Sequence, residues 1–186
     1  MNKFSLKQTL IDGLTLITRK PVIDDRGQFD KLFCLDDLQK ELQLAKVAQI
    51  NHSRTNDIGT IRGLHFQLPP YSEMKIVCCI KGAVFDVAVD IRKNSPTFLK
   101  WHGEILSAEN LNSLLIPKGF AHGFQTLNEN SELIYIHTQP FKKEYEACLN
   151  ATDPNIGIEW PRVISNRSRR DKSQKFIDSQ FKGIVV

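Results

Sequence analysis

Short apolar segments separated by turn-forming residues recur along the whole of this chain. The clearest are LTLITR, KIVCCI, AVFDVAVDI, NSLLIP, GFQTL and ELIYIHT, with Gly, Pro, Asn and Asp between them. Short strands bounded by such residues are typical of an antiparallel sandwich or barrel. A chain of 186 residues can bury roughly 70% of its unfolded surface in one core. We therefore predict an all-β fold and a single domain over residues 1–186.

The segments KIVCCI and AVFDVAVDI are separated by only Lys81 and Gly82. A two-residue link whose glycine tolerates a positive φ predicts a β-hairpin. Alternation gives the second strand two faces. One face carries Phe85, Val87 and Val89, and the other carries Asp86, Ala88 and Asp90. The acidic face either borders a cavity or faces solvent and caps a turn, and periodicity alone leaves both interpretations open.

Helical signals are few. Residues 35–45, LDDLQKELQLA, carry leucines at helical spacing after an Asp-rich start, and a second helix is expected near Ser168. We therefore expect a few short peripheral helices around the β structure.

Charge and cysteine usage exclude several classes of protein. The net charge is +4, and six basic residues gather in RVISNRSRRDKSQK without interleaved aromatic residues, so we expect no nucleic-acid partner. No run of about 18 apolar residues occurs, which argues against a membrane partner. The four cysteines lack zinc-type spacing, and Cys78 and Cys79 should point to opposite faces of a strand. We expect a cytoplasmic protein in a reducing compartment.

Two histidines stand in unusual surroundings, IRGLHFQ at residues 61–67 and IPKGFAHGF at residues 116–124. Glycine and apolar or aromatic neighbours favour a strand or turn wall over a helix face. Because imidazole titrates at about pH 6.5, burial or a carboxylate partner can tune it as a general base. A single histidine in such a setting is more often a core residue, but two of them favour an enzyme.

Histidines at the strand ends of a β-barrel also raise a metal hypothesis. A metal site of the cupin type (a small double-stranded β-barrel) takes HxH and a downstream Glu from one motif and another His from a second motif. Here His65 and His122 are kept, but Gln67 occupies the place of the other histidine. Two imidazoles without the remaining ligands make a poor site, so we expect no metal. No glycine-rich phosphate loop occurs either, so Arg26, Arg62 and Lys75 are the candidates to hold a phosphate.

A longer series of motifs runs through nearly the whole chain. In order these are DDRGQF at 24–29, QINHSR at 49–54, TIRGLHFQ at 60–67, MKIV at 74–77, GAVFDVAVDIRKNSPTF at 82–98, IPKGFAHGF at 116–124, Tyr135, DPNIGIEWP at 153–161 and SRRD at 168–171. Together they resemble the dTDP-4-dehydrorhamnose 3,5-epimerase family. The resemblance implies a cupin-type double-stranded β-barrel, or jelly roll, that is usually a homodimer. It also implies a nucleotide-linked 4-keto-6-deoxyhexose substrate, no cofactor, and a place in deoxysugar and cell-surface polysaccharide biosynthesis.

The resemblance further assigns catalytic roles. His65 is the expected base, and Asp171 orients it and stabilises its charge. Tyr135 is the expected acid on the opposite face of the sugar, and Lys75 is expected near the developing enolate oxygen. These residue types suit the reaction, because a 4-keto group acidifies the C–H bonds at C3 and C5. A cation near O4 stabilises the enolate, and inversion follows when a neutral acid returns the proton to the other face.

Substrate-binding residues follow from the same resemblance. Arg62 is expected near the diphosphate, with Gln49 and Asn51 close by. Arg26 and Phe29 are expected to lie toward the nucleoside, either within the same chain or across a dimer interface. His122 is expected in the pocket wall. The ring of Phe29 could stack on a base.

Two departures from the family pattern leave alternatives open. Lys31 stands where the family commonly has an acid suited to accept the N3–H of thymine, and a cationic donor would suit cytosine in a CDP-linked sugar. Phe141 stands near the place of a second family tyrosine, so inversion at one carbon only is also open. A non-catalytic sugar-nucleotide-binding cupin and a metal-dependent cupin oxygenase are more distant alternatives.

Overall fold

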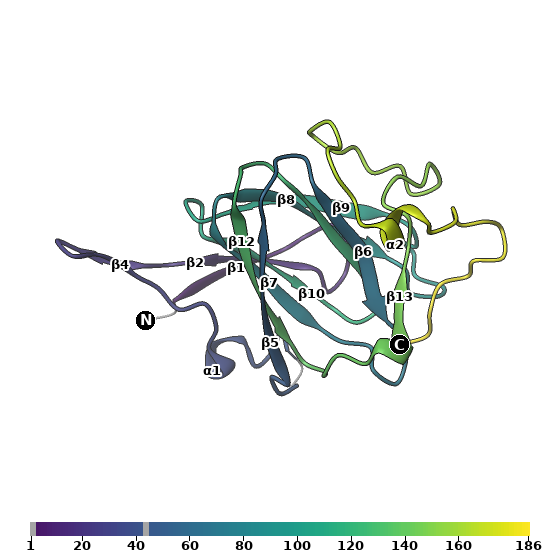
Figure 1. Ribbon diagram of the computed structural model, residues 1–186. Helices are drawn as coiled ribbons and strands as arrows, with labels where there is room; N and C mark the ends of the chain where they lie inside the picture. The colour runs from purple at the N-terminus through teal and green to yellow at the C-terminus, as the bar shows by residue number, and fades with distance from the viewer. Residues whose placement is uncertain (1–2, 43–44) are drawn as a thin grey trace.

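A computed structural model describes residues 3–42 and 45–186, and two antiparallel sheets form most of it (Figure 1). The six-stranded sheet has the spatial order β1 (Phe4–Gln8), β2 (Thr15–Arg19), β10 (Asn112–Ile116), β7 (Lys75–Lys81), β12 (Ser131–His137) and β5 (Gln49–Thr55). The five-stranded sheet has the order β13 (Glu146–Cys148), β6 (Ile61–Gln67), β11 (Phe120–Thr126), β8 (Ala83–Asp90) and β9 (Trp101–Ser107). A separate hairpin pairs β3 (Val22–Asp24) with β4 (Gly27–Phe29) and projects from the body.

The apolar segments found in the sequence all contribute strands, which confirms the all-β prediction. The predicted hairpin at Lys81 and Gly82 is wrong, because β7 pairs with β10 and β12 while β8 pairs with β11 and β9. At Gly82, with φ +71°, the chain passes from one sheet to the other. A short turn signal fixes a change of direction but does not specify which strands become neighbours.

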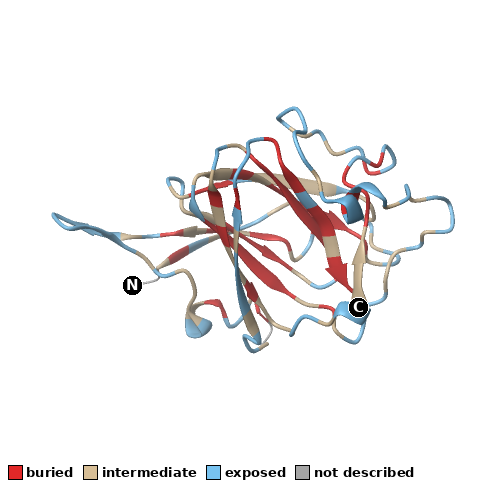
Figure 2. Ribbon diagram, in the orientation of Figure 1, coloured by how far each residue is buried: buried red, intermediate tan, exposed pale blue. Residues whose placement is uncertain are grey.

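The core lies between the two sheets and is extended by apolar layers on their outer faces (Figure 2). Val77 and Leu133 of the six-stranded sheet meet Val84 and Phe124 of the five-stranded sheet in the interior. The C-terminal segment covers the outer face of the five-stranded sheet with Leu149 and other apolar side chains. This segment, which also carries Asp171, is thereby held against the strand that carries His65.

Helices are short and peripheral, as the sequence predicted. They are α1 (Leu35–Leu38), the 3-10 turn η1 (Lys143–Tyr145) and α2 (Arg169–Lys172). The helix expected over residues 35–45 ends at Leu38, and Leu44 of that prediction lies outside the described residues. Leu38 and Leu42 are buried against the six-stranded sheet, so the leucine spacing reflects a short turn of helix followed by hydrogen-bonded turns. The second helix begins next to Ser168, as expected.

The two faces predicted for β8 are confirmed. Phe85, Val87 and Val89 pack on the outer side of the sheet, and Ala88 lies in the interior. Both aspartates are buried, but they have different partners. Asp86 contacts His122, whereas Asp90 accepts hydrogen bonds from the turn that follows it. One aspartate therefore supports the interior and the other caps a turn.

Two further expectations concern the cysteines and membrane spans. All four cysteines are free thiols, and Cys78 and Cys79 pack into different apolar clusters on opposite sides of their strand. Over residues 3–42 and 45–186, no helix is long and apolar enough to cross a bilayer.

The glycines beside the two histidines face each other where β6 and β11 pair. Gly63 has φ +123°, and a Cβ there would lie 2.6 Å from the Cα of Gly123 and 2.7 Å from the carbonyl oxygen of His122. A Cβ on Gly123 would lie 2.7 Å from the carbonyl oxygen of Arg62. This close approach sits at a shift in the strand register, and it lets His65 pair directly opposite His122.

Replacing Gly63 should therefore disturb the strand pair that carries both histidines. We expect Gly63→Ala to lower the free energy of unfolding by at least about 1–3 kcal/mol, because it combines a positive φ with a backbone clash. Thermal or chemical denaturation measures the loss. Gly27→Ala is the matched control, since Gly27 has φ +126° but no atom within 4 Å of the added Cβ. Equal losses in the two variants would show that the clash contributes nothing.

Candidate active site

A cavity of about 980 Å³ opens between the two sheets and the C-terminal segment. Seven of the residues predicted for the site line it: Asn51, Arg62, His65, Lys75, His122, Tyr135 and Asp171. His65 and His122 come from the five-stranded sheet, whereas Lys75 and Tyr135 come from the six-stranded sheet. The cavity is thus walled by ionisable groups from both layers of the fold.

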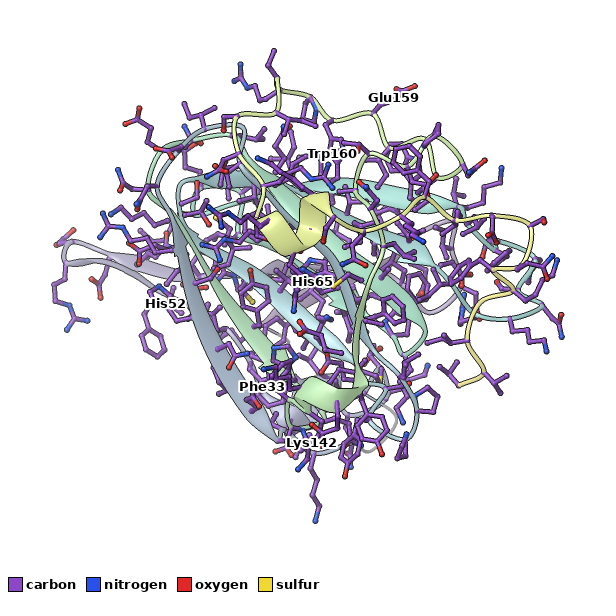
Figure 3. The ribbon with its side chains drawn as sticks, turned by 45° about the vertical axis from the view of Figure 1, so that its right-hand side comes forward. Phe33, His52, His65, Lys142, Glu159 and Trp160 are labelled. Carbon is purple, nitrogen blue, oxygen red and sulfur yellow. The ribbon has the colours of Figure 1, made fainter. Side chains whose placement is uncertain are left out.

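His65 is paired with Asp171 across more than a hundred residues of sequence. The Nε2 atom of His65 lies 2.8 Å from Oδ1 of Asp171, whose side chain is only 4% exposed. Asp171 belongs to helix α2. The backbone N–H of Asp171 donates a hydrogen bond to the hydroxyl oxygen of Ser168 at 3.0 Å. Figure 3 shows His65 beside α2 at the front of the barrel. A capped turn therefore fixes the carboxylate that orients the imidazole.

The partners of His65 favour its protonated form. Burial opposes the charge, but hydrogen bonds with Asp171 and Cys148 outweigh burial and raise the pKa of His65 to about 9. Burial also opposes ionisation of Asp171, yet the hydrogen bond with His65 lowers the pKa of Asp171. Arg170 lies beside the pair, with Nη2 3.0 Å from His65 Nε2, and it also binds Glu146.

His122 sits in a different electrostatic environment. Its side chain is 6% exposed, and its Nε2 lies 2.8 Å from Oδ2 of the fully buried Asp86. Burial lowers the pKa of His122 even though Asp86 opposes that shift. His122 is therefore the more readily neutral imidazole of the two, and its ring lies edge-on to Tyr135 at 6.2 Å.

Tyr135 presents a hydroxyl that stays protonated. Its oxygen lies 3.1 Å from the hydroxyl of Ser53 on the neighbouring strand β5. Burial raises the pKa of Tyr135, although the hydrogen bond with Ser53 opposes the rise. His137 stacks on the tyrosine ring with centroids 6.1 Å apart. The hydroxyl and the ring of Tyr135 are therefore both in contact with other side chains of the cavity.

Lys75 is buried and held by a carboxylate. Its Nζ lies 3.1 Å from Oε1 of Glu73, and the lysine side chain is 7% exposed. The second carboxylate oxygen of Glu73 lies 3.3 Å from Nδ1 of His137 and accepts from Gln67 at 3.0 Å. Burial opposes ionisation of Glu73, but the hydrogen bond with His137 and the charge of Lys75 lower the pKa of Glu73 to about 2. A carboxylate thus anchors the ammonium group inside the cavity.

Arg62 and the polar end of β5 form the outer wall. Arg62 Nε donates to Thr55 Oγ1 at 2.9 Å, and Nη2 donates to the carbonyl oxygen of Arg54 at 3.1 Å. Asn51 lies 3.4 Å from His137 Nε2. Gln49 does not line the cavity, but it donates to Asn51 at 2.9 Å and accepts from the backbone N–H of Phe141. Phe141 does line the cavity and is about half exposed.

Besides Gln49, three predicted binding residues lie outside the cavity of their own chain. Arg26 and Phe29 belong to the projecting hairpin, where Arg26 pairs with Asp24 at 2.6 Å and Phe29 is 75% exposed. Lys31 follows the hairpin and pairs with Asp37 at 3.3 Å. The structure of one chain therefore does not bring these side chains to the histidines.

Several cavity residues were not singled out from the sequence: Glu73, His137, Glu146 and Arg170. Strand alternation could have found His137, because it lies two residues after Tyr135 and shares its face. Cys148 was also missed, although it pairs with His65 between β13 and β6. No sequence signal links Cys148 to His65, because only the strand order makes them neighbours.

Gln67, which stands where a metal-binding cupin has a histidine, is occupied by structural contacts. Its Oε1 accepts from the backbone N–H of Lys142 at 2.7 Å, and its Nε2 donates to Glu73 and two backbone carbonyls. The side chain of Gln67 therefore joins Glu73 in the cavity to the segment that follows β12.

The fold and the cavity define an enzyme of the acid–base class built on a cupin-type barrel. The family model for dTDP-4-dehydrorhamnose 3,5-epimerase matches residues 8–179. The dTDP-4-dehydrorhamnose 3,5-epimerase of Sinorhizobium fredii is 43% identical over 165 residues, which cover 88% of this chain and 85% of the relative. The Shigella flexneri enzyme of the same name is 42% identical over 178 residues, covering 94% and 97%.

A solved structure agrees with these relatives. The crystal structure of dTDP-6-deoxy-D-glucose-3,5-epimerase from Legionella pneumophila, in complex with dTDP-4-keto-L-rhamnose, matches with a TM-score of 0.91 and 37% identity. The match covers 98% of this chain and 99% of that one. The chain belongs to the dTDP-4-dehydrorhamnose 3,5-epimerase family. It is an isomerase of the carbohydrate epimerase type, and the predicted cupin-type fold is confirmed.

The pairing of His65 with Asp171 should be visible in the titration of the imidazole. We expect Asp171→Asn to lower the pKa of His65 from about 9, because the carboxylate stabilises the imidazolium ion. NMR titration of the histidine ring signals measures the shift. Asp37→Asn is the control variant, because Asp37 pairs with Lys31 outside the cavity, and it should leave the His65 titration unchanged. An unchanged His65 pKa in Asp171→Asn would mean that Asp171 does not set the charge of the imidazole.

Proposed function

We propose that this epimerase inverts C3, C5 or both in a nucleotide-linked 4-keto-6-deoxyhexose of the dTDP-4-dehydro-6-deoxyglucose type. The proposal places the chain, as a single domain over residues 1–186, in deoxysugar and cell-surface polysaccharide biosynthesis. One observation carries it: a histidine–carboxylate pair and a neutral tyrosine enter the same cavity from opposite sheets. Inversion needs a base and an acid on opposite faces of the sugar, and the arrangement of these side chains supports that requirement.

His65 is proposed to remove the proton next to the 4-keto group. Asp171 holds one ring nitrogen, so the other nitrogen of the neutral ring accepts the proton. The resulting imidazolium ion is stabilised by the same carboxylate, in keeping with a pKa of about 9. A strongly basic imidazole gains driving force for abstraction, at the cost of a smaller neutral fraction at pH 7.

Tyr135 and Lys75 are proposed to complete the reaction. Lys75 is proposed to stabilise the charge that develops on O4, and its contact with Glu73 would keep the ammonium group in place as the enolate forms. The hydroxyl of Tyr135 remains neutral and can give a proton to the face opposite His65. The chemistry needs no cofactor, because proton transfer alone interconverts the two configurations.

Incubation of dTDP- and CDP-linked 4-keto-6-deoxyhexoses in D₂O tests the function directly. We expect deuterium to enter C3, C5 or both from the dTDP sugar, since each inversion exchanges a carbon-bound proton with solvent. Lys31, the residue that raised the CDP alternative, pairs with Asp37 outside the cavity of its own chain, so its position there does not favour cytosine. His65→Ala should reduce turnover roughly 10²–10⁴-fold, as is typical for a lost general base.

The matched control is His102→Ala, because His102 is also near a carboxylate, Glu104 at 3.5 Å, but does not line the cavity. Turnover by His102→Ala should stay close to that of the unmodified protein. Near-normal deuterium incorporation by His65→Ala would refute the assignment of the base. No incorporation into either sugar by the unmodified protein would refute the function.

We further propose that the active form is a homodimer in which the hairpin of one chain reaches the cavity of the other. The hairpin projects from the body, exposes Val22, Ile23 and Phe29, and keeps Arg26 away from its own histidines. Arg26 and Phe29 would then contact the nucleoside bound by the partner, near Arg62. An apolar hairpin exposed in this way is stabilised when a second copy covers it.

Mixed dimers test this arrangement. We expect His65→Ala and the double variant Arg26→Ala/Phe29→Ala each to be weakly active alone. Co-expression should restore about a quarter of normal activity, because half of the dimers are hybrids and each hybrid has one intact site. Light scattering should report a dimer for every variant. A monomeric protein, or no recovery in the mixture, would refute the shared site.

A further inference from the structure

Cys148 lies in the strand next to His65 and takes no part in the proton transfers of the proposed reaction. The antiparallel pair of β13 and β6 sets Cys148 directly opposite His65. Asp171 approaches from α2, and one donor atom from each of the three residues lies within 4.8 Å of the other two. A thiol, an imidazole and a carboxylate therefore surround one point beside the cavity.

This set of donors is suited to zinc. Zn²⁺ prefers sulfur and nitrogen ligands with carboxylate oxygen, in a tetrahedral arrangement with three protein ligands and one open position. Tetrahedral ligands at about 2.0–2.3 Å from the metal lie roughly 3.3–3.8 Å apart. Donors that are now up to 4.8 Å apart would need to approach by about an ångström, whereas His65 Nε2 and Asp171 Oδ1, now 2.8 Å apart, would need to separate by roughly half an ångström. Side-chain rotation can supply both movements. Mg²⁺ and Ca²⁺ favour oxygen ligands and fit this set poorly.

The charges around the three residues permit a cation. Asp171 contributes one negative charge, and the thiol contributes a second when it releases its proton to solvent on metal binding. The protonated His65 also releases a proton to solvent, so that the neutral imidazole offers its lone pair to the metal. Arg170 is the opposing cation, with Nη2 3.0 Å from His65 Nε2. Its side chain is 48% exposed and is held by two hydrogen bonds to Glu146, so it can leave His65 and keep its carboxylate partner.

We propose that Zn²⁺ binds His65, Cys148 and Asp171 and thereby inhibits the epimerase. A neutral imidazole has one free lone pair, and coordination of either ring nitrogen to the metal occupies it. The zinc-bound His65 can then no longer accept a proton from the sugar. This site differs from the metal site of other cupins, because it uses Cys148 of β13 and leaves His122 with Asp86. The inhibition rests on the proposed role of His65 as the base, whereas the binding does not.

Cobalt binding tests the site without any measurement of activity. We expect Co²⁺ to give a thiolate-to-metal charge-transfer band in the near ultraviolet with the unmodified protein. Cys148→Ser should abolish the band. If the serine variant does not fold, Cys148→Ala replaces it in the same measurement. Cys34→Ser is the matched control, because Cys34 is also half-buried but lies near Lys31 and Asp37. Absence of the band in the unmodified protein, or its loss in Cys34→Ser, would overturn the proposal.

Zinc titration of the epimerase tests the consequence. Each variant is compared with its own rate in the absence of metal. Cys148→Ser should need at least about tenfold more Zn²⁺ for half inhibition, because two remaining ligands bind zinc much more weakly than three. Cys34→Ser should respond like the unmodified protein. Equal sensitivity of Cys148→Ser would overturn the proposed inhibition, and cobalt binding at Cys148 without any inhibition would instead contradict the role of His65 as the base.

Discussion

The close approach of β6 and β11 at Gly63 and Gly123 is the constraint on which the site depends. Without Cβ atoms, the two backbones come close enough to set His65 opposite His122. Each histidine then meets a different carboxylate, but the net shift in pKa is opposite for the two. The partners of His65 raise its pKa, whereas burial outweighs the effect of Asp86 and lowers the pKa of His122. One pair of strands therefore carries two imidazoles whose pKa values are shifted in opposite directions.

The charged side chains of the cavity are stabilised by contacts with one another. Lys75 is held by Glu73, and Glu73 in turn lies against His137 and Gln67. Such contacts offset the cost of removing charged groups from water and fix their positions before substrate arrives. The buried Tyr135 stays neutral in the same surroundings. Burial thus has different effects on the groups, since it favours the neutral phenol and leaves the paired ions charged.

Strand periodicity in the sequence predicted most of the fold, because alternation of apolar residues is a local property. It did not predict that β7 and β8 lie in different sheets, since the turn at Gly82 is compatible with both a hairpin and a crossover. The family motifs predicted His65, Lys75 and Tyr135 in one cavity. They did not point to Cys148, whose neighbour across the sheet depends on strand order.

The sequence by itself determined the strands, the glycines that permit their close approach, and the residue types that proton transfer requires. These properties depend on neighbours along the chain and on side-chain chemistry. Only the tertiary structure decided that Asp171 lies against His65 and that Tyr135 reaches the cavity from the opposite sheet. It also decided that Cys148 lies close enough to His65 and Asp171 to complete the proposed set of zinc ligands. Such contacts join residues far apart in sequence, and they form only when the sheets pack and the C-terminal segment covers β6.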